Sequence, residues 1–189
     1  MRITQEKKQE NHDRIVAKAS EVFRERGFDG IGVADLMDAA GFTHGGFYNH
    51  FRSKEELIAK ATEKGFAETA KQYAGMDSLA ALDLYLSRAH RDARGQGCSA
   101  AALGCDAARQ PEETRSAFGN GIEAMVDALA HDISKRRNDG TDVRAKAISV
   151  LAQAVGAVIL SRACPDDSAL ADEFLDACRA DCRDAIEHR

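Results

Sequence analysis

Histidine and cysteine are the side chains in this 189-residue sequence whose types could do catalysis, bind metal or react with oxidants. His44 and His50 lie in the run GFTHGGFYNHFRSK, which spans residues 41–54. They are six residues apart, off the i, i+4 face that helical metal sites use. The local sequence places no Ser, Cys or carboxylate beside them as a catalytic partner. We therefore predict neither a metal site nor a catalytic histidine pair, and we expect neither enzyme activity nor a cofactor.

Cys98 is the cysteine with the most distinctive sequence context. It follows RGQG and opens a predicted helix, where the helix dipole favours the reactive thiolate. Cys105 would lie about 10.5 Å away along that helix, too far for a disulfide. The five cysteines show no paired spacing, which suits reduced thiols in a cytoplasmic protein. Two interpretations of Cys98 stay open: a redox-reactive thiol, or a small residue packed at a helix start.

The composition favours an all-α fold. The chain has two prolines, no Trp, few clusters of Val, Ile and Thr, and no long segment of period-two alternation. At 44% apolar and 30% charged residues, it can build a core and stay soluble. No run approaches the roughly 20 uncharged apolar residues of a membrane helix, and the N-terminus shows no secretion signal. We therefore expect a cytoplasmic location and no membrane partner.

The net charge of −5 is unevenly distributed. Residues 1–64 hold 11 basic and 11 acidic residues, whereas residues 65–189 hold 15 and 20. The excess acidity therefore lies outside the N-terminal third. Because docking depends on the local field more than on total charge, nucleic acid stays a possible partner.

Nine helices are predicted from apolar periodicity and from start and stop signals. Gly41 supplies a tight turn, and Thr43 and Ser53 are helix caps, with Glu56 completing a capping box. AGMDS at 74–78 indicates a boundary. The predicted helices are 11–26, 33–40, 44–51, 54–73, 79–93, 98–109, 112–136, 142–163 and 168–187.

Two short helices joined at Gly41 form a predicted helix-turn-helix, whose second helix can lie in the DNA major groove. Phe47 and Phe51, four residues apart, would pack inward. The intervening polar side chains would face outward, and Lys54 could meet a backbone phosphate. The pair Gly45-Gly46 weakens a helix. It either lets something approach the backbone closely or leaves few side chains to read bases.

The run VADLMDAAGFTHGGFYNHFRSKEELIAKA, preceded by IVAKASEVFRERGF, resembles the DNA-binding domain of the TetR family of bacterial repressors. The resemblance covers about residues 10–70. It implies an N-terminal arm (1–9), a DNA-binding domain (10–70, with the helix-turn-helix at about 33–52) and an effector-binding and dimerisation domain (75–189). Where the family usually has a Thr or Ser cap, this chain has Ile31-Gly32. The implied DNA-binding residues are Thr43, His44, Gly45, Gly46, Tyr48, Asn49, His50 and Lys54.

The last two predicted helices carry wide apolar faces. These could form an internal core, or a four-helix seam between two copies, and the resemblance implies the homodimer. Two recognition helices about 34 Å apart would then read a palindromic operator. The predicted interface residues are Val150, Leu151, Ala154, Val155, Val158, Ile159, Phe174 and Cys178.

The resemblance also implies an effector pocket between the middle helices, although plain core packing is an equal alternative for each residue. The predicted function is a homodimeric repressor released by a small-molecule effector or by thiol-reactive stress. The alternative is a helical small-molecule-binding protein without DNA. The sequence identifies neither effector nor operator. The candidate pocket residues are Phe66, Tyr73, Tyr85, Cys105, Arg109, Phe118, Ile122, Met125 and Val126.

Overall fold

The computed structural model describes residues 4–136 and 142–187. Within these ranges the chain forms nine α-helices and two short 3₁₀ helices, with no strand, which confirms the all-α prediction. In chain order the elements are α1 (Gln5–Arg26), α2 (Val33–Ala39), η1 (His44–Asn49), α3 (Lys54–Tyr73), α4 (Ser78–Tyr85), α5 (Arg88–Asp92), η2 (Arg94–Gln96), α6 (Ser99–Ala107), α7 (Glu112–Arg136), α8 (Val143–Ala163) and α9 (Ala169–Glu187).

The helices follow the predicted positions closely, but α1 begins six residues earlier than expected. Thr4 caps it, because the Thr4 hydroxyl accepts a hydrogen bond from the backbone N–H of Lys7 at 3.2 Å. Residues 5–9 are therefore helical, where no helix was predicted. The C-terminal end was predicted correctly: Gly27 stops α1 with a φ of +78°.

The helix predicted over 79–93 is also wrong, because the structure has two helices there. Leu86 leaves the helical conformation after α4, and the Ser87 hydroxyl accepts a hydrogen bond from the N–H of His90 at 3.1 Å to begin α5. The expected cap of α3 is confirmed, since the Ser53 hydroxyl accepts from the N–H of Glu56 at 3.3 Å. The Glu56 carboxylate accepts a hydrogen bond from the N–H of Arg52 (2.7 Å), and not from that of Ser53, the partner expected in a capping box.

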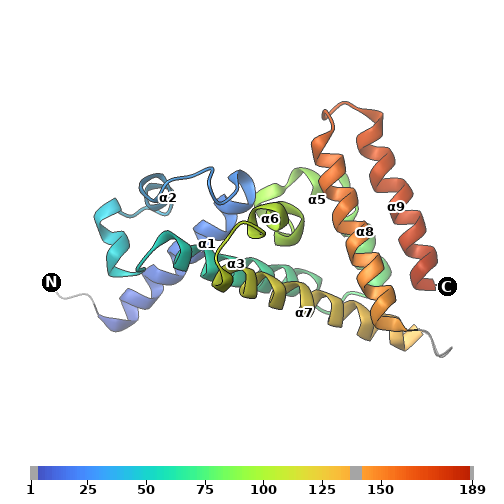
Figure 1. The fold of residues 1–189 in the computed structure, drawn as a ribbon, viewed down its shortest axis with the longest axis horizontal. Coiled ribbons are helices and arrows are strands. Elements are labelled where there is room, and N and C mark those ends of the chain that lie inside the picture. The colour runs from blue at the N-terminus through green and yellow to red at the C-terminus, as the bar shows by residue number, and fades with distance from the viewer. Residues whose placement is uncertain (1–3, 137–141, 188–189) are drawn as a thin grey trace.

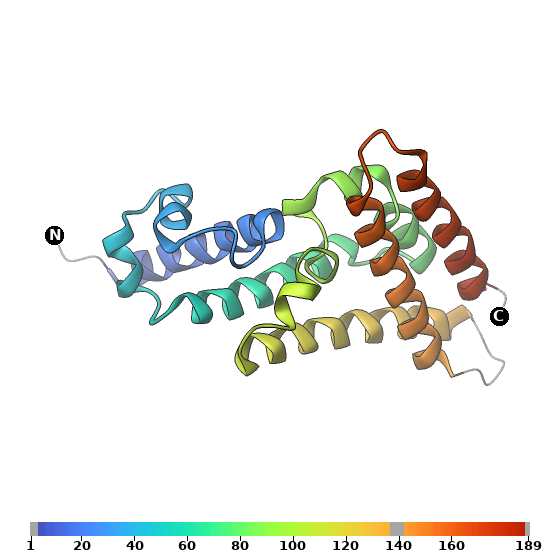
Figure 2. The same cartoon turned by 45° about the horizontal axis from the view of Figure 1, so that its top comes forward.

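The molecule is elongated (Figure 1). The helices α1 and α2 and the 3₁₀ helix η1 gather at one end, and the antiparallel pair α8 and α9 lies at the other. Two long helices connect the ends: α3 leaves the N-terminal group, and α7 packs along it before turning into α8 (Figures 1 and 2). A displacement within the C-terminal helices can therefore reach the N-terminal group through α3.

A buried arginine joins α1 to the C-terminal part. Arg24 donates from Nε to the Gly95 carbonyl (2.8 Å), from Nη1 to the Ser20 hydroxyl (2.6 Å) and from Nη2 to the Glu68 carboxylate (3.1 Å). Arg24 is 5% exposed, and Gly95 is buried. Because such groups are costly to leave unpaired, Arg24 holds α1, η2 and α3 in one arrangement.

Helix α8 leaves much of its apolar surface uncovered. By length and composition it could cross a membrane, with a mean hydropathy of 1.6 over 18 residues, contrary to the expectation of no such stretch. Core helices of soluble proteins pass the same test, yet only 28% of this window is buried in the protomer. Ile148 and Leu160 are nearly half exposed. This face is the natural candidate for contact with a second copy.

Candidate nucleic-acid interface and effector cavity

The segment predicted to read DNA is the 3₁₀ helix η1, and not the predicted α-helix over 44–51. Gly41 takes a φ of +79° at the turn after α2. Phe47 and Phe51 are 1% and 2% exposed with ring centroids 5.5 Å apart, which confirms that they face inward. Thr43 stands at the N-cap position, but its side chain makes no capping hydrogen bond, so that part of the prediction was wrong. Its exposed hydroxyl is left available to a ligand.

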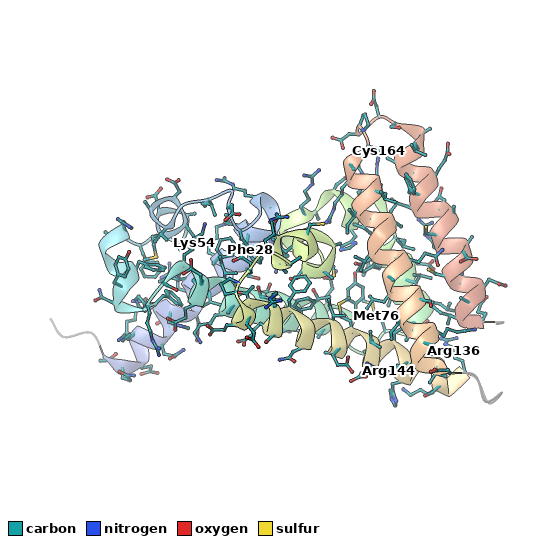
Figure 3. All side chains as sticks on the ribbon, in the orientation of Figure 1. Phe28, Lys54, Met76, Arg136, Arg144 and Cys164 are labelled. Atoms are coloured by element: carbon teal, nitrogen blue, oxygen red, sulfur yellow. The ribbon has the colours of Figure 1, made fainter. Side chains whose placement is uncertain are left out.

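Most of the predicted DNA-binding side chains are exposed. Tyr48 is 70% exposed and rests edge-on against Phe47, with ring centroids 5.2 Å apart. His44 and Asn49 are also exposed. Lys54 is half-buried at the start of α3, within the N-terminal group (Figure 3). These exposed tyrosine, amide and hydroxyl side chains are of the types that contact nucleic acid.

His50, like Lys54, is less exposed than His44, Tyr48 and Asn49. It is half-buried, with its ring centroid 6.4 Å from those of both His12 and Phe42. Burial, followed by the nearby charges of His12 and Lys8, lowers the pKa of His50. The imidazole is therefore held neutral, and its buried Nδ1 has no hydrogen-bond partner among the described residues. A neutral ring can still donate to a phosphate, but without the help of a positive charge.

Neither glycine of the pair is required by the packing of the protein itself. A Cβ atom added at Gly45 would meet nothing within 4 Å. One at Gly46 would meet the Thr43 hydroxyl at 3.6 Å and Met37 at 3.8 Å, which are ordinary contacts. Neither residue has a positive φ. The fold would accept side chains at both positions, so both interpretations of the glycine pair stay open.

The sequence analysis did not single out basic side chains of α1 and of the turn after η1. Arg14 lies over the Phe42 ring, with its guanidinium carbon 5.1 Å from the ring centroid. The charge of Lys8 acts on His50, so α1 passes beside η1. Arg52 is exposed directly after Phe51. The available signal was the cap at Thr4, which extends α1 far enough to bring Lys8 to this surface.

A cavity of about 660 Å³ lies between α3, α4, α7, α8 and α9. The lining includes four of the predicted pocket residues, Phe66, Tyr73, Tyr85 and Met125. The Tyr73 and Tyr85 ring centroids are 6.3 Å apart. The structure therefore brings together predicted pocket residues from three different helices.

The other five predicted pocket residues do not line this cavity. Phe118 packs edge-on against Phe66 at 5.0 Å, and Val126 is buried elsewhere. On α7 the cavity side is Gly121, Ala124, Met125 and Ala128, whereas Ile122 faces solvent. Cys105 and Arg109 lie exposed at the end of α6 and in the turn after it. The sequence pattern identified an apolar stripe but could not say which side of it a cavity would face.

Cys98 is buried, with 1% of its surface exposed. It occupies the N-cap position of α6 and donates its backbone N–H to His90 Nε2 at 3.0 Å. Because a carbonyl can only accept, His90 Nδ1 donates to the Tyr85 carbonyl (2.6 Å), which fixes the tautomer. Burial lowers the pKa of His90. The packing favours the interpretation of Cys98 as a small residue at a helix start.

The predicted dimer residues fall into two groups. Val150, Ala154 and Val158 are at most 5% exposed within one protomer, so they belong to its core and do not face a partner. Val150 and Ala154 also line the cavity. The remaining five are half-buried. Ile148 and Leu160, two exposed apolar residues of α8, were not predicted for the interface, and Leu170 of α9 is exposed as well. Among the described residues no group of three or more His, Cys, Asp or Glu could hold a metal ion.

Known proteins match this chain in sequence and in fold. The family model of the bacterial regulatory proteins of the TetR family matches residues 15–61. The repressor DhaR of Mycobacterium sp. strain GP1 is 32% identical over 90 residues, which cover 44% of this chain and 46% of DhaR. This match therefore spans less than half the length of DhaR.

Two solved structures show the same fold. The transcriptional regulator of Cytophaga hutchinsonii superposes over the whole of both chains with a TM-score of 0.79 and 22% identity. The reduced form of the Escherichia coli repressor NemR gives a TM-score of 0.76 at 20% identity, over 93% of this chain and 96% of NemR. Residues 15–61 of this chain therefore match the TetR family of bacterial regulatory proteins, and the chain as a whole shares the fold of these two regulators.

Proposed function

We propose that this protein is a homodimeric transcriptional repressor that binds palindromic operator DNA and is released when an effector occupies the cavity. The observation that carries the proposal is the exposed surface of η1, with Tyr48 and Asn49 outward, inside the segment that matches the family model. DhaR and NemR are named as repressors, which supports the same role for this chain. The proposed place of action is the bacterial cytoplasm.

The connection between cavity and DNA surface runs along α3. This helix opens with Lys54 beside η1 and lines the cavity with Phe66 and Tyr73. Its 20 residues span about 30 Å, so a small tilt at the cavity end becomes a displacement of Lys54. A ligand that binds the two arrangements of α3 with different affinity shifts their populations and so changes operator affinity.

Dimerisation is supported by the uncovered side of α8 and α9. Ile148, Leu160 and Leu170 are each nearly half exposed, and the surface between them is rich in Ala and Gly156. Exposed apolar patches of this kind on soluble proteins mark interaction sites. Small residues let two helix pairs approach closely, and a two-fold axis there would place two copies of η1 for a palindrome.

A thiol-based release is a second route within the same proposal. Cys98 donates its backbone N–H to His90, which in turn bonds the carbonyl of the cavity residue Tyr85, so modification of Cys98 would disturb the cavity wall. The relative NemR is known in a form described as reduced. Because Cys98 is buried, a reagent would first have to enter the protein, and Cys98→Ser should then abolish release by that reagent.

The competing function is a small-molecule-binding protein that does not contact DNA. Electrophoretic mobility shifts on DNA upstream of the protein's own gene separate the two. The repressor should give a discrete complex whose affinity falls steeply as salt rises, since Lys54 and other cations displace counterions from phosphates. Binding no tighter than to unrelated DNA of equal length at every salt concentration would favour the competing function.

A further inference from the structure

Two tyrosines of the cavity lining carry hydroxyls that nothing in the described protein satisfies. Tyr73 and Tyr85 both line the cavity, and Tyr85 is 6% exposed. Both hydroxyl oxygens are buried and without a hydrogen-bond partner among the described residues. Buried polar groups are nearly always hydrogen-bonded, and an exception indicates a missing partner. A ligand in the cavity could supply it.

The two hydroxyls are suited to donate hydrogen bonds. Burial raises the pKa of both tyrosines, and the nearby Cys98 thiol raises them further. They therefore stay protonated at neutral pH. The Cys98 thiol lies near the Tyr85 hydroxyl and is only a weak hydrogen-bond partner, and it makes no hydrogen bond of ordinary geometry with it. A neutral phenol at the end of an apolar cavity selects a hydrogen-bond acceptor such as a carbonyl oxygen.

The rest of the lining is mainly apolar. The charged lining residues Asp77 and Asp132 are both engaged by Arg136, at 3.2 and 3.4 Å. Asp132 also accepts from the backbone N–H of Ser78 at 2.8 Å. Lys135 lines the cavity with an exposed side chain. The apolar side chains include Phe66, Leu82, Met125, Leu129, Val150 and Ile186.

We propose that the effector is an uncharged, largely apolar molecule whose acceptor oxygen binds the hydroxyls of Tyr73 and Tyr85. The assignment rests on the proposed function of the cavity and adds the chemistry of its ligand. A cavity of about 660 Å³ accommodates a molecule of drug-like size. A charged ligand would have to leave water for a mainly apolar wall, and the lining cation Lys135 is exposed to solvent, which weakens its attraction for an anion in the cavity.

The test is a displacement assay on the intact protein without DNA. Nile red, a neutral apolar dye, reports occupancy by fluorescence. Its competitors form a matched set: 2-acetonaphthone, 2-ethylnaphthalene and 2-naphthoate share one ring system but carry a ketone, a hydrocarbon and a carboxylate. The ketone should displace the dye most effectively. Its advantage over the hydrocarbon should be roughly three- to tenfold, as expected of one net hydrogen bond.

Two variants assign that advantage to the tyrosines. Tyr85→Phe and Tyr73→Phe each remove one hydroxyl and keep the ring, so 2-ethylnaphthalene should bind as before while the ketone loses its preference. Ser116→Ala removes an exposed hydroxyl from α7 outside the cavity and should change neither. A circular dichroism spectrum of each variant checks that it is folded.

Three results would overturn the proposal: tighter binding of 2-naphthoate than of the ketone, an unchanged ketone preference in both Phe variants, or no binding of Nile red to the folded protein. The outcome is separable from the wider function, because operator binding is measured without any effector. A protein that binds its operator but prefers 2-naphthoate would keep the regulatory role and refute only the ligand assignment.

Discussion

Gly119 and Gly121 lie two residues apart on α7 in opposite surroundings. A Cβ atom at Gly121 would meet the Phe66 ring at 2.2 to 2.6 Å, and that ring is held by Phe118. One at Gly119 would meet nothing within 4 Å. We predict that Gly121→Ala lowers the free energy of unfolding by about 1–3 kcal/mol through overpacking. Gly119→Ala should raise it by about 0.5–1 kcal/mol through helix propensity.

Urea denaturation of both variants measures the difference. The comparison is internally controlled, because each variant adds one methyl group to the same helix. Equal effects of the two substitutions, in either direction, would show that Phe66 does not pack against α7 at Gly121.

His90 should make stability depend on pH. Burial lowers its pKa in the folded protein, and protonation of Nε2 would break the hydrogen bond from the N–H of Cys98. The stabilisation is therefore present above the unfolded value of about 6.5 and is lost as pH falls through the lower folded value. The melting temperature should drop between about pH 7.5 and pH 5.5.

The control for this prediction is His90→Gln, which cannot titrate in that range. Thermal melts should show a smaller drop in the variant than in the wild type. A part of the drop should persist, because the pKa of His50 is lowered too. Identical pH profiles for the two proteins would exclude His90 as a source of the dependence.

At the residue scale, the sequence predicted correctly where the neighbours are local. The four-residue spacing of Phe47 and Phe51 was enough to place both inward and Tyr48 outward. It was not enough for His50, whose burial comes from His12 and Phe42 on other elements. Nor could it show that Cys98 packs against His90 across the turn between α5 and α6. Burial by distant elements has no local signature.

A substitution of Arg24 tests how α1, η2 and α3 are held together. Replacing it by Met keeps an apolar stem but leaves the buried Gly95 carbonyl without its donor. We expect Arg24→Met to lower the free energy of unfolding by about 1–3 kcal/mol, the cost of an unpaired buried polar group. Arg26→Met, at an exposed position of the same helix, should change it by less than about 0.5 kcal/mol.

Chemical denaturation followed by circular dichroism gives both values. A loss for Arg24→Met as small as that for Arg26→Met would mean that the Gly95 contact does not hold α1 to the C-terminal part.

At the element scale, the glycines that end helices were predicted correctly, but two of the Ser and Thr residues that begin helices were missed. Gly27 and Gly41 end their helices with the positive φ that glycine permits. The cap at Thr4 and the break at Ser87 were missed, because serine and threonine are common both inside and at the ends of helices. The 3₁₀ form of η1 also escaped prediction, since two glycines weaken an α-helix without saying what replaces it.

Substitutions on the exposed apolar face of α8 and α9 test whether two copies of the protein associate there. Ile148 and Leu160 are nearly half exposed, so aspartate at both positions should leave the protomer folded. We predict that Ile148→Asp combined with Leu160→Asp converts the proposed dimer to a monomer of 20.4 kDa in sedimentation velocity. Two charges cannot be desolvated at an apolar seam without a large cost.

Ser116→Asp, on the exposed side of α7, is the matched control and should stay dimeric. If the double variant sediments as the wild-type dimer, the two copies associate through a different surface.

At the scale of the whole molecule, the sequence indicated the fold class but only part of the cavity lining. Helix α8 shows why: its apolar residues occupy the whole circumference, so periodicity cannot separate a core face from a seam face. Val150 and Val158 were predicted for the seam and lie in the core. The packing of α9 and α7 against α8 decides which side of α8 stays exposed.

The most direct test of the central claim, that η1 reads operator DNA, is fluorescence anisotropy on DNA upstream of the gene. It compares the wild type with the Tyr48→Ala, Asn49→Ala double variant. Both side chains are exposed, so thermal stability should not change. Because each base contact is worth about 1–3 kcal/mol, operator affinity should fall by at least about tenfold. Unchanged operator affinity in a folded double variant would contradict the account.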